Sequence, residues 1–173
     1  MWNDYLLMIL LVICVITDVK ERKIYNKVLL PFLLLALIIH FATDGFSGLG
    51  FTVAGTIVGF AVLLIPYFMG GMGAGDVKLL AVIGGLKGTV FVLTAAVYMA
   101  LAGGILAFVV LFFRKGAWGR IRQIGMFFGG LRSGMRIPLL VDKEGLTATY
   151  PYGVAIAIGA IAAVVFQTGG GLL

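Results

Sequence analysis

Two aspartates are the residues most able to do chemistry: Asp18, at the end of the first apolar run, and Asp76, after a glycine-rich segment. The apolar stretch 5–16 is too short to cross a bilayer, which takes about 20 residues, so its helix must continue through Asp18 to the inner face. The chain returns to that face at Asp76 after its third apolar run. Two such carboxylates can share a proton, activate water and polarise a carbonyl group. Ionisable groups in membrane segments are functional by default, so these two form a candidate catalytic pair.

The segment before Asp76 contains four glycines within residues 70–75. Glycine allows unusual backbone conformations and lets a second chain approach closely, which an acid acting on an extended peptide needs. A glycine-rich loop that enters a helix can also hold phosphate. However, no lysine–serine pair of a P-loop follows, and the carboxylate of Asp76 would repel an anion. Phosphate binding is therefore the weaker interpretation.

The other five acidic residues have simpler explanations. They are expected in water at the outer face, in the basic stretch after the first run, or in the loop before the last run: Asp4, Asp44, Glu21, Asp142 and Glu144. The single histidine, His40, falls in the outer half of the second run and is expected to be a packed or interface-facing residue rather than a ligand.

The composition indicates the elements that must position the two aspartates. Of the 173 residues, 62% are hydrophobic and 12% are charged, and the mean hydropathy is +1.16. An ordinary soluble domain carries about 25% charged residues. A chain with so few charges and so many apolar residues belongs in a membrane. One cysteine, Cys14, excludes a disulfide scaffold. The chain is predicted to be an all-α polytopic membrane protein with six spans, at about residues 2–20, 28–43, 49–69, 76–87, 89–113 and 151–168.

The fourth run, 76–87, is unusually short for a span. A helix of this length rises only about 18 Å at 1.5 Å per residue. It must be a short helix shielded by its neighbours, or continue bent through Gly84, Gly85 and Gly88 into the fifth run.

The distribution of basic residues predicts the orientation. With the N-terminus outside, every lysine and arginine except Lys87 falls on the cytoplasmic side, as the positive-inside rule requires. The net charge of +6 therefore reflects topology, and nucleic-acid binding is set aside. Residues 114–150 mix basic with bulky apolar side chains. They are predicted to form an interfacial segment on the cytoplasmic side that binds anionic lipids.

Three parts of the chain resemble one protein family. Gly73-Ala74-Gly75-Asp76 resembles the GxGD motif of intramembrane aspartyl proteases, and Lys78 follows it. Asp18 precedes Lys23-Ile24-Tyr25-Asn26, and type IV prepilin peptidases carry a similar motif with proline where Tyr25 stands. The last run opens with Tyr150-Pro151-Tyr152-Gly153, which is similar to the proline-containing final helix of that family. The chain therefore resembles the type IV prepilin peptidases over nearly its whole length.

The resemblance implies an intramembrane aspartyl endopeptidase that requires no metal and no cofactor. Asp18 and Asp76 would be its catalytic residues. The implied substrates are prepilins or pilin-like precursors, whose short basic leader is cut at the cytoplasmic face of the cell membrane. The residues expected to line or bind substrate are Gly73, Gly75, Lys78 and Pro151.

Longer members of this family also methylate the new N-terminus and carry two zinc-binding Cys-x-x-Cys pairs. This chain has one cysteine and resembles the short peptidase-only members, such as those of tight-adherence pili, so no N-methyltransferase activity is expected. The alternatives are a small proton- or cation-coupled transporter that uses the same two aspartates, and a non-catalytic assembly subunit. The sequence leaves the oligomeric state open, homo-oligomers included.

Overall fold

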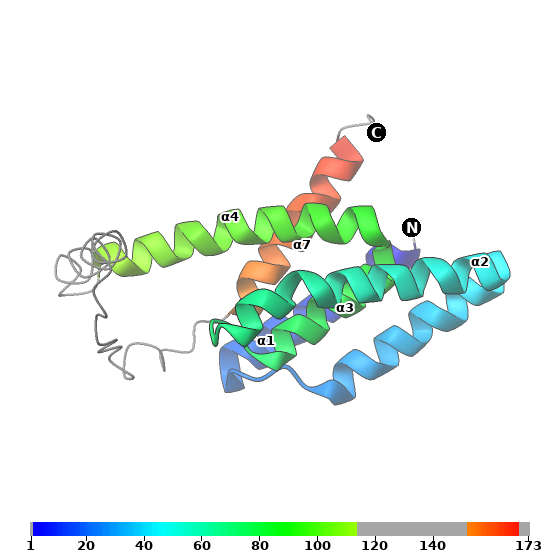
Figure 1. Cartoon of the computed structure of the whole chain (residues 1–173), viewed down its shortest axis with the longest axis horizontal. Helices are drawn as coiled ribbons and strands as arrows, with labels where there is room; N and C mark the ends of the chain where they lie inside the picture. The colour runs from blue at the N-terminus through cyan, green and yellow to red at the C-terminus, as the bar shows by residue number, and fades with distance from the viewer. Residues whose placement is uncertain (1, 114–151, 170–173) are drawn as a thin grey trace, which may run out of the picture. The chain divides into compact units, whose positions relative to one another are not determined.

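The computed structural model describes residues 2–113 and 152–169, and within these residues the chain is helical, with no strand. Residues 1–103 and 150–173 belong to one compact unit, which holds every contact discussed below, and residues 104–149 form a second unit. The predicted interfacial segment 114–150 and Pro151 lie outside the described residues. The elements in chain order are α1 (Trp2–Glu21), α2 (Asn26–Phe68), α3 (Ala74–Lys87), α4 (Thr89–Phe113) and α7 (Tyr152–Gly169) (Figure 1).

The 43-residue element α2 is a helical hairpin rather than one continuous helix (Figure 1). The backbone leaves the helical region at Gly45, with φ 59° and ψ −135°, a conformation that glycine adopts at low cost. The two arms then pack closely, since a Cβ on Gly48 would lie 2.0 Å from the carbonyl oxygen of His40. The second and third predicted runs, 28–43 and 49–69, fall on these two arms.

The first glycines of the cluster at 70–75 terminate α2. Gly70 has a φ of +75°, and its N–H donates to the carbonyl of Tyr67, while the N–H of Gly71 donates to the carbonyl of Pro66. This pair of hydrogen bonds is the Schellman motif, which satisfies the last carbonyls of a helix and favours glycine at the left-handed position. Gly70 therefore has a structural role in addition to the flexibility expected of the cluster.

The short helix α3 is buried along nearly its whole length, from Asp76 to Leu86, with Lys78 as the exposed exception. It packs backbone to backbone against the returning arm of α2. A Cβ on Gly55 would lie 2.0 Å from the Gly84 carbonyl oxygen, and one on Gly84 would lie 2.1 Å from the Gly55 carbonyl oxygen. Glycines at such interfaces let membrane helices approach closely.

The shielded short helix expected for residues 76–87 is thus confirmed. The alternative, a helix that continues bent into the fifth run, is wrong. Gly88 has a φ of +86° and separates α3 from α4, because a right-handed helix cannot pass through that conformation.

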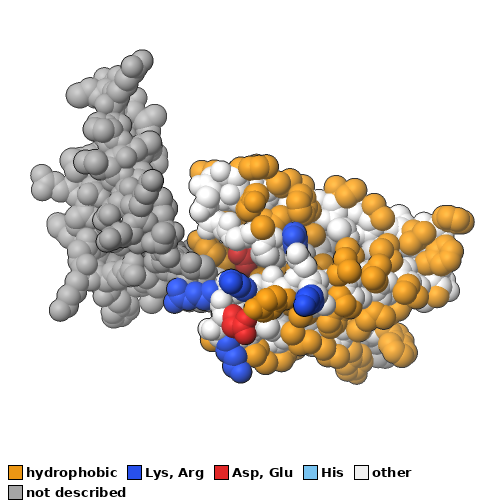
Figure 2. Space-filling model, turned by 90° about the horizontal axis from the view of Figure 1, so that it is seen from below, with side chains coloured by type: hydrophobic (Ala, Val, Ile, Leu, Met, Phe, Trp, Pro, Cys, Tyr) orange, Lys and Arg blue, Asp and Glu red, His pale blue; other side chains and the backbone are white. Residues whose placement is uncertain are grey.

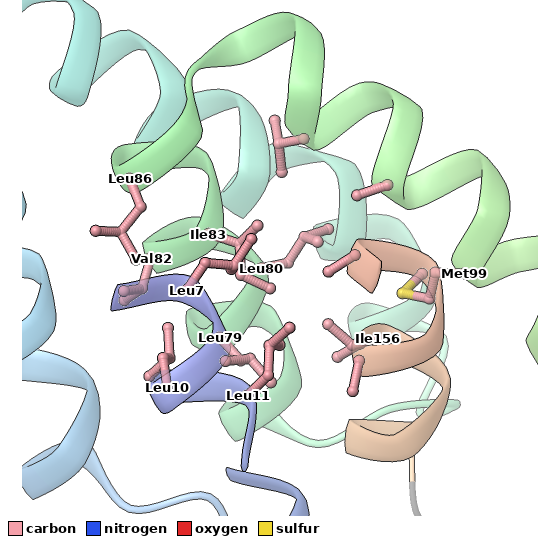
Figure 3. Close-up of a cluster of buried hydrophobic side chains, with 14 of the residues drawn as sticks. Leu7, Leu10, Leu11, Leu79, Leu80, Val82, Ile83, Leu86, Met99 and Ile156 are labelled. Carbon is pink, nitrogen blue, oxygen red and sulfur yellow. The ribbon is translucent and has the colours of Figure 1, made fainter. Parts of the chain in front are cut away.

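The core forms where α1, α3 and α7 meet (Figure 3). Leucines of α1 interdigitate with aliphatic side chains of α3, and Ile156 of α7 and Met99 of α4 complete the cluster. The buried side chains of α1 and α3 in this core include Leu7, Leu10, Leu11, Leu79, Leu80, Ile83 and Leu86. This packing fixes α1 and α7 against the helix that begins just before Asp76.

Many large apolar side chains of α1 and α2 point outward instead. Within the part of the chain that the structure describes, α1 and α2 are long and apolar enough to cross a membrane, and Thr89–Ile105 and Tyr152–Gln167 are shorter apolar helices. Figure 2 shows lysine and arginine side chains gathered toward one end of the described part and hydrophobic side chains over much of the rest. The count of six spans and their orientation remain predictions.

Lys87, the one basic residue expected on the outer side, forms an ion pair. Its Nζ lies 2.6 Å from Oδ1 of Asp4 and 5.0 Å from the ring centroid of Phe91. Asp4, expected in water and without a function, is partly exposed and has a structural role as the partner of Lys87. The ion pair neutralises a mostly buried ammonium group and ties the start of α1 to the end of α3.

Replacing Asp4 with Asn is therefore expected to lower the free energy of unfolding by about 1–2 kcal/mol, between the values for exposed and buried ion pairs. The double variant D4N/K87M should lose less than the sum of its single changes, because no unpaired ammonium group remains. Thermal unfolding in detergent measures both effects, with Asp44→Asn as an exposed control. Equal melting temperatures for D4N and the wild type would contradict the prediction.

Candidate active site

Asp18 lies in the last turn of α1, and its side chain is only 6% exposed. Its Oδ2 accepts a hydrogen bond from the backbone N–H of Gly153, over 3.0 Å. Gly153 is the second residue of α7, and the first N–H groups of a helix have no partner within the helix. The carboxylate of Asp18 therefore occupies the amino end of α7, where the helix dipole favours negative charge.

Asp76 lies in the first turn of α3, and its side chain is 8% exposed. Its Oδ2 accepts a hydrogen bond from the backbone N–H of Gly73 over 3.1 Å, while its own N–H donates to the carbonyl oxygen of Gly73. This side-chain contact is the carboxylate half of a capping box. Gly73 is thus the residue that orients Asp76.

The fold brings the two aspartates, far apart in sequence, to one site. Both are buried on helices that pack together, α1 and α3, and they lie close enough for their charges to interact. Two buried carboxylates that lie near each other can share one proton between them. A pair that shares a proton can offer both a proton acceptor and a proton donor, which is the combination that general acid–base hydrolysis uses.

The stretch between α1 and α2, together with the first residue of α2, packs against the first turns of α3. A Cβ on Gly75 would lie 3.0 Å from the Cβ of Ile24, and Lys78 Nζ donates to Asn26 Oδ1 over 3.1 Å. The two segments that carry the family resemblance are thus in contact. Gly75 is needed for packing within the chain, whatever its role toward substrate.

Tyr25, which stands where proline is usual in the family, donates its hydroxyl hydrogen bond to Glu21. This bond raises the pKa of the Tyr25 phenol, because the neighbouring carboxylate disfavours a second negative charge. The chain leaves α1 at Arg22 in a left-handed conformation, with a φ of 52°. The Tyr25–Glu21 pair spans this turn.

His40 lies outside the aspartate site. Its Nδ1 is 2.6 Å from Thr52 Oγ1 and its Nε2 is 3.1 Å from Asn3 Nδ2, and the side chain is 7% exposed. The expectation of a packed histidine is confirmed. It borders a cavity of about 410 Å³ between the start of α1 and the tip of the α2 hairpin, and neither Asp18 nor Asp76 lines this cavity. Among the residues that the structure describes, no three His, Cys, Asp or Glu side chains gather to hold a metal ion.

Of the predicted site residues, Gly73 contacts Asp76, whereas Gly75 and Lys78 contact Ile24 and Asn26, and Pro151 lies outside the described residues. Sequence reasoning missed Gly153, which lies two positions after Pro151 in the same quoted motif. It also missed the packing roles of Ile24 and Asn26. The only sign of these residues in the sequence was that they belong to the motifs shared with the family. Such a motif marks a residue as important but does not show which residue it contacts.

The two aspartates lie buried on apolar helices, and comparison with known proteins places this part of the chain in a peptidase family. The sequence model described as the type IV leader peptidase family matches residues 5–108, which include both aspartates. The chain belongs to this family, and with its long apolar helices it is a membrane protein.

One relative is the "Prepilin leader peptidase/N-methyltransferase" of Bacillus subtilis (strain 168). It is 34% identical over 99 residues, which cover 56% of this chain and 39% of the relative. The match therefore spans well under half of that protein's length. No solved structure matches the chain.

Proposed function

We propose that this protein is an intramembrane aspartyl endopeptidase that removes the short basic leader from type IV prepilins or pilin-like precursors. The observation that carries the proposal is the buried, interacting pair Asp18 and Asp76, each held by a glycine N–H, within the segment that matches the leader peptidase family. A structural role alone would favour apolar residues here, since burying two like charges is costly.

In the proposed reaction the ionised aspartate takes a proton from water, and the resulting hydroxide attacks the scissile carbonyl carbon. The protonated aspartate donates a hydrogen bond to the carbonyl oxygen and stabilises the tetrahedral intermediate. The amide nitrogen then leaves with a proton from the pair, so no covalent enzyme intermediate is formed. The proton belongs to the pair as a unit and is not assigned to either residue.

The proposed setting is the cytoplasmic face of the cell membrane, with six spans and the N-terminus outside. Exposed basic side chains surround the end of the molecule that holds the aspartates: Lys20, Arg22, Lys23, Lys27 and Lys78. These charges suit the anionic inner leaflet. Because they would repel a basic leader, substrate selection rests on the hydrophobic helix of the precursor as well as on acidic residues.

We propose peptidase activity without methyl transfer, as in the forms that serve tight-adherence pili. The basis is the single cysteine of the sequence, Cys14, which is buried in α1 and cannot build paired Cys-x-x-Cys motifs. Methylated product formed by this protein with S-adenosylmethionine alone would overturn this part.

The test is cleavage of a synthetic prepilin by the purified protein in detergent. The wild type should release the leader, Asp18→Asn should not, and Asp44→Asn, an exposed acid on the α2 hairpin, should match the wild type. The same preparations in liposomes are assayed for proton flux. Flux that depends on Asp18 in a protein that cleaves nothing would overturn the proposal in favour of a transporter.

A further inference from the structure

We infer that Gly153 is a positioning residue of the catalytic site, which makes the amino end of α7 a third element beside α1 and α3. The inference rests on the proposed function. It assigns two roles to this glycine: it offers its N–H to Asp18, and it leaves the space in which the carboxylate lies.

The first observation is the hydrogen bond. The N–H of Gly153 donates to Asp18 Oδ2 over 3.0 Å, and the contact is buried. It mirrors the bond from Gly73 to Asp76 Oδ2, so that each carboxylate is oriented by a glycine N–H in the first turn, or just before the first turn, of a helix. A donor of this kind fixes which oxygen of the carboxylate faces the reaction.

The second observation is steric and independent of the first. A Cβ on Gly153 would lie 2.7 Å from Oδ2, 3.0 Å from Cγ and 3.2 Å from Cβ of Asp18. Contacts under 3.0 Å force something to move, and the movable group here is the carboxylate itself. Any side chain at this position therefore displaces Asp18, even one as small as alanine.

The consequence for the reaction is misalignment rather than loss of a reacting group. A displacement of about 1 Å in a catalytic group can cost about 10²-fold in rate. Gly153→Ala should therefore reduce kcat about 10²-fold with KM within about twofold, because substrate binding is not touched. Gly153→Pro removes the N–H as well, and proline is tolerated in the first turn of a helix.

The pH dependence gives a signature that a packing defect does not. Loss of a donor to the ionised carboxylate should move the acidic limb of the cleavage profile to higher pH, further for Gly153→Pro than for Gly153→Ala. Among the described residues, the other titratable groups that interact with Asp18 are Cys14 and Arg22 of its own helix and Asp76 of α3, and these variants leave all three in place.

Gly159→Ala is the matched control on the same helix. Its Cβ would lie 2.6 Å from both the carbonyl oxygen of Ala95 and the N atom of Met99, so it disturbs the packing of α7 against α4, about 9 Å along the helix from Gly153. This variant should melt earlier than the wild type, but its folded fraction should keep the wild-type kcat and pH profile. If Gly153→Ala behaves like Gly159→Ala in these two readouts, the inference is overturned.

A double-mutant cycle in thermal unfolding tests the contact without any activity. Gly153→Ala should lower the melting temperature by several degrees in the wild type and by clearly less in an Asp18→Ala background, where the clashing carboxylate is gone. Equal losses in both backgrounds would refute the contact. If the contact is verified while Asp18→Asn still cleaves prepilin, the proposed function fails and not the geometry.

Discussion

Replacing Asp76 with Asn is expected to lower cleavage of a prepilin by at least about 10³-fold, the scale of a lost general acid or base. Asparagine has nearly the same shape as aspartate, and its carbonyl oxygen can still accept the N–H of Gly73, which now lies 3.1 Å from Oδ2. The fold should therefore be kept. Since the substitution removes a buried charge beside Asp18, the variant should unfold no more readily than the wild type.

The same pair predicts strong non-additivity. Once Asp76 is Asn, the partner carboxylate has nothing to share its proton with, so the added change Asp18→Asn should cost less than about tenfold more. Cleavage rates of the two single variants and the double variant, with melting temperatures measured alongside, check this. Independent, multiplying losses would contradict the concerted pair, and retained cleavage by D76N would contradict the proposed chemistry altogether.

Replacing Gly84 with Val is expected to prevent correct folding, with a loss of at least about 3 kcal/mol, at or above the top of the usual range for overpacked cores. The Cβ alone would lie 2.1 Å from the carbonyl oxygen of Gly55, and backbone atoms on both sides leave no side chain free to move away. This steric clash can be relieved only if α3 separates from the returning arm of α2. That separation would also displace Asp76, which lies on α3.

Gly50→Val is the matched control, since Gly50 is an exposed helical glycine of the same α2 element with no heavy atom within 4 Å of an added Cβ. It should change stability by less than about 0.5 kcal/mol. The yield of monodisperse protein after detergent extraction and the melting temperature separate the two variants. Normal yield and melting of Gly84→Val would show that the close approach of α2 and α3 is not required.

The amino-acid sequence alone determined the elements and the chemical groups. The predicted run 89–113 has the same bounds as α4, and the runs 2–20 and 76–87 differ from α1 and α3 by at most two residues at an end. These bounds follow from local properties, namely apolar length interrupted by charges and glycines. The position of Asp18 within the first helix was also predictable, because an apolar stretch too short to span must be lengthened by the residues that follow it.

The partners of these groups could not be predicted, because they lie far away in the chain. The contact of Gly153 with Asp18, the ion pair of Lys87 with Asp4 and the close approach of Gly55 to Gly84 leave no periodic trace in the local sequence. The sequence does not distinguish a glycine that caps a helix from one that allows another backbone to approach or one that contacts a carboxylate. Only the packed structure distinguishes these roles, since each depends on which atom of another helix occupies the space of the missing side chain.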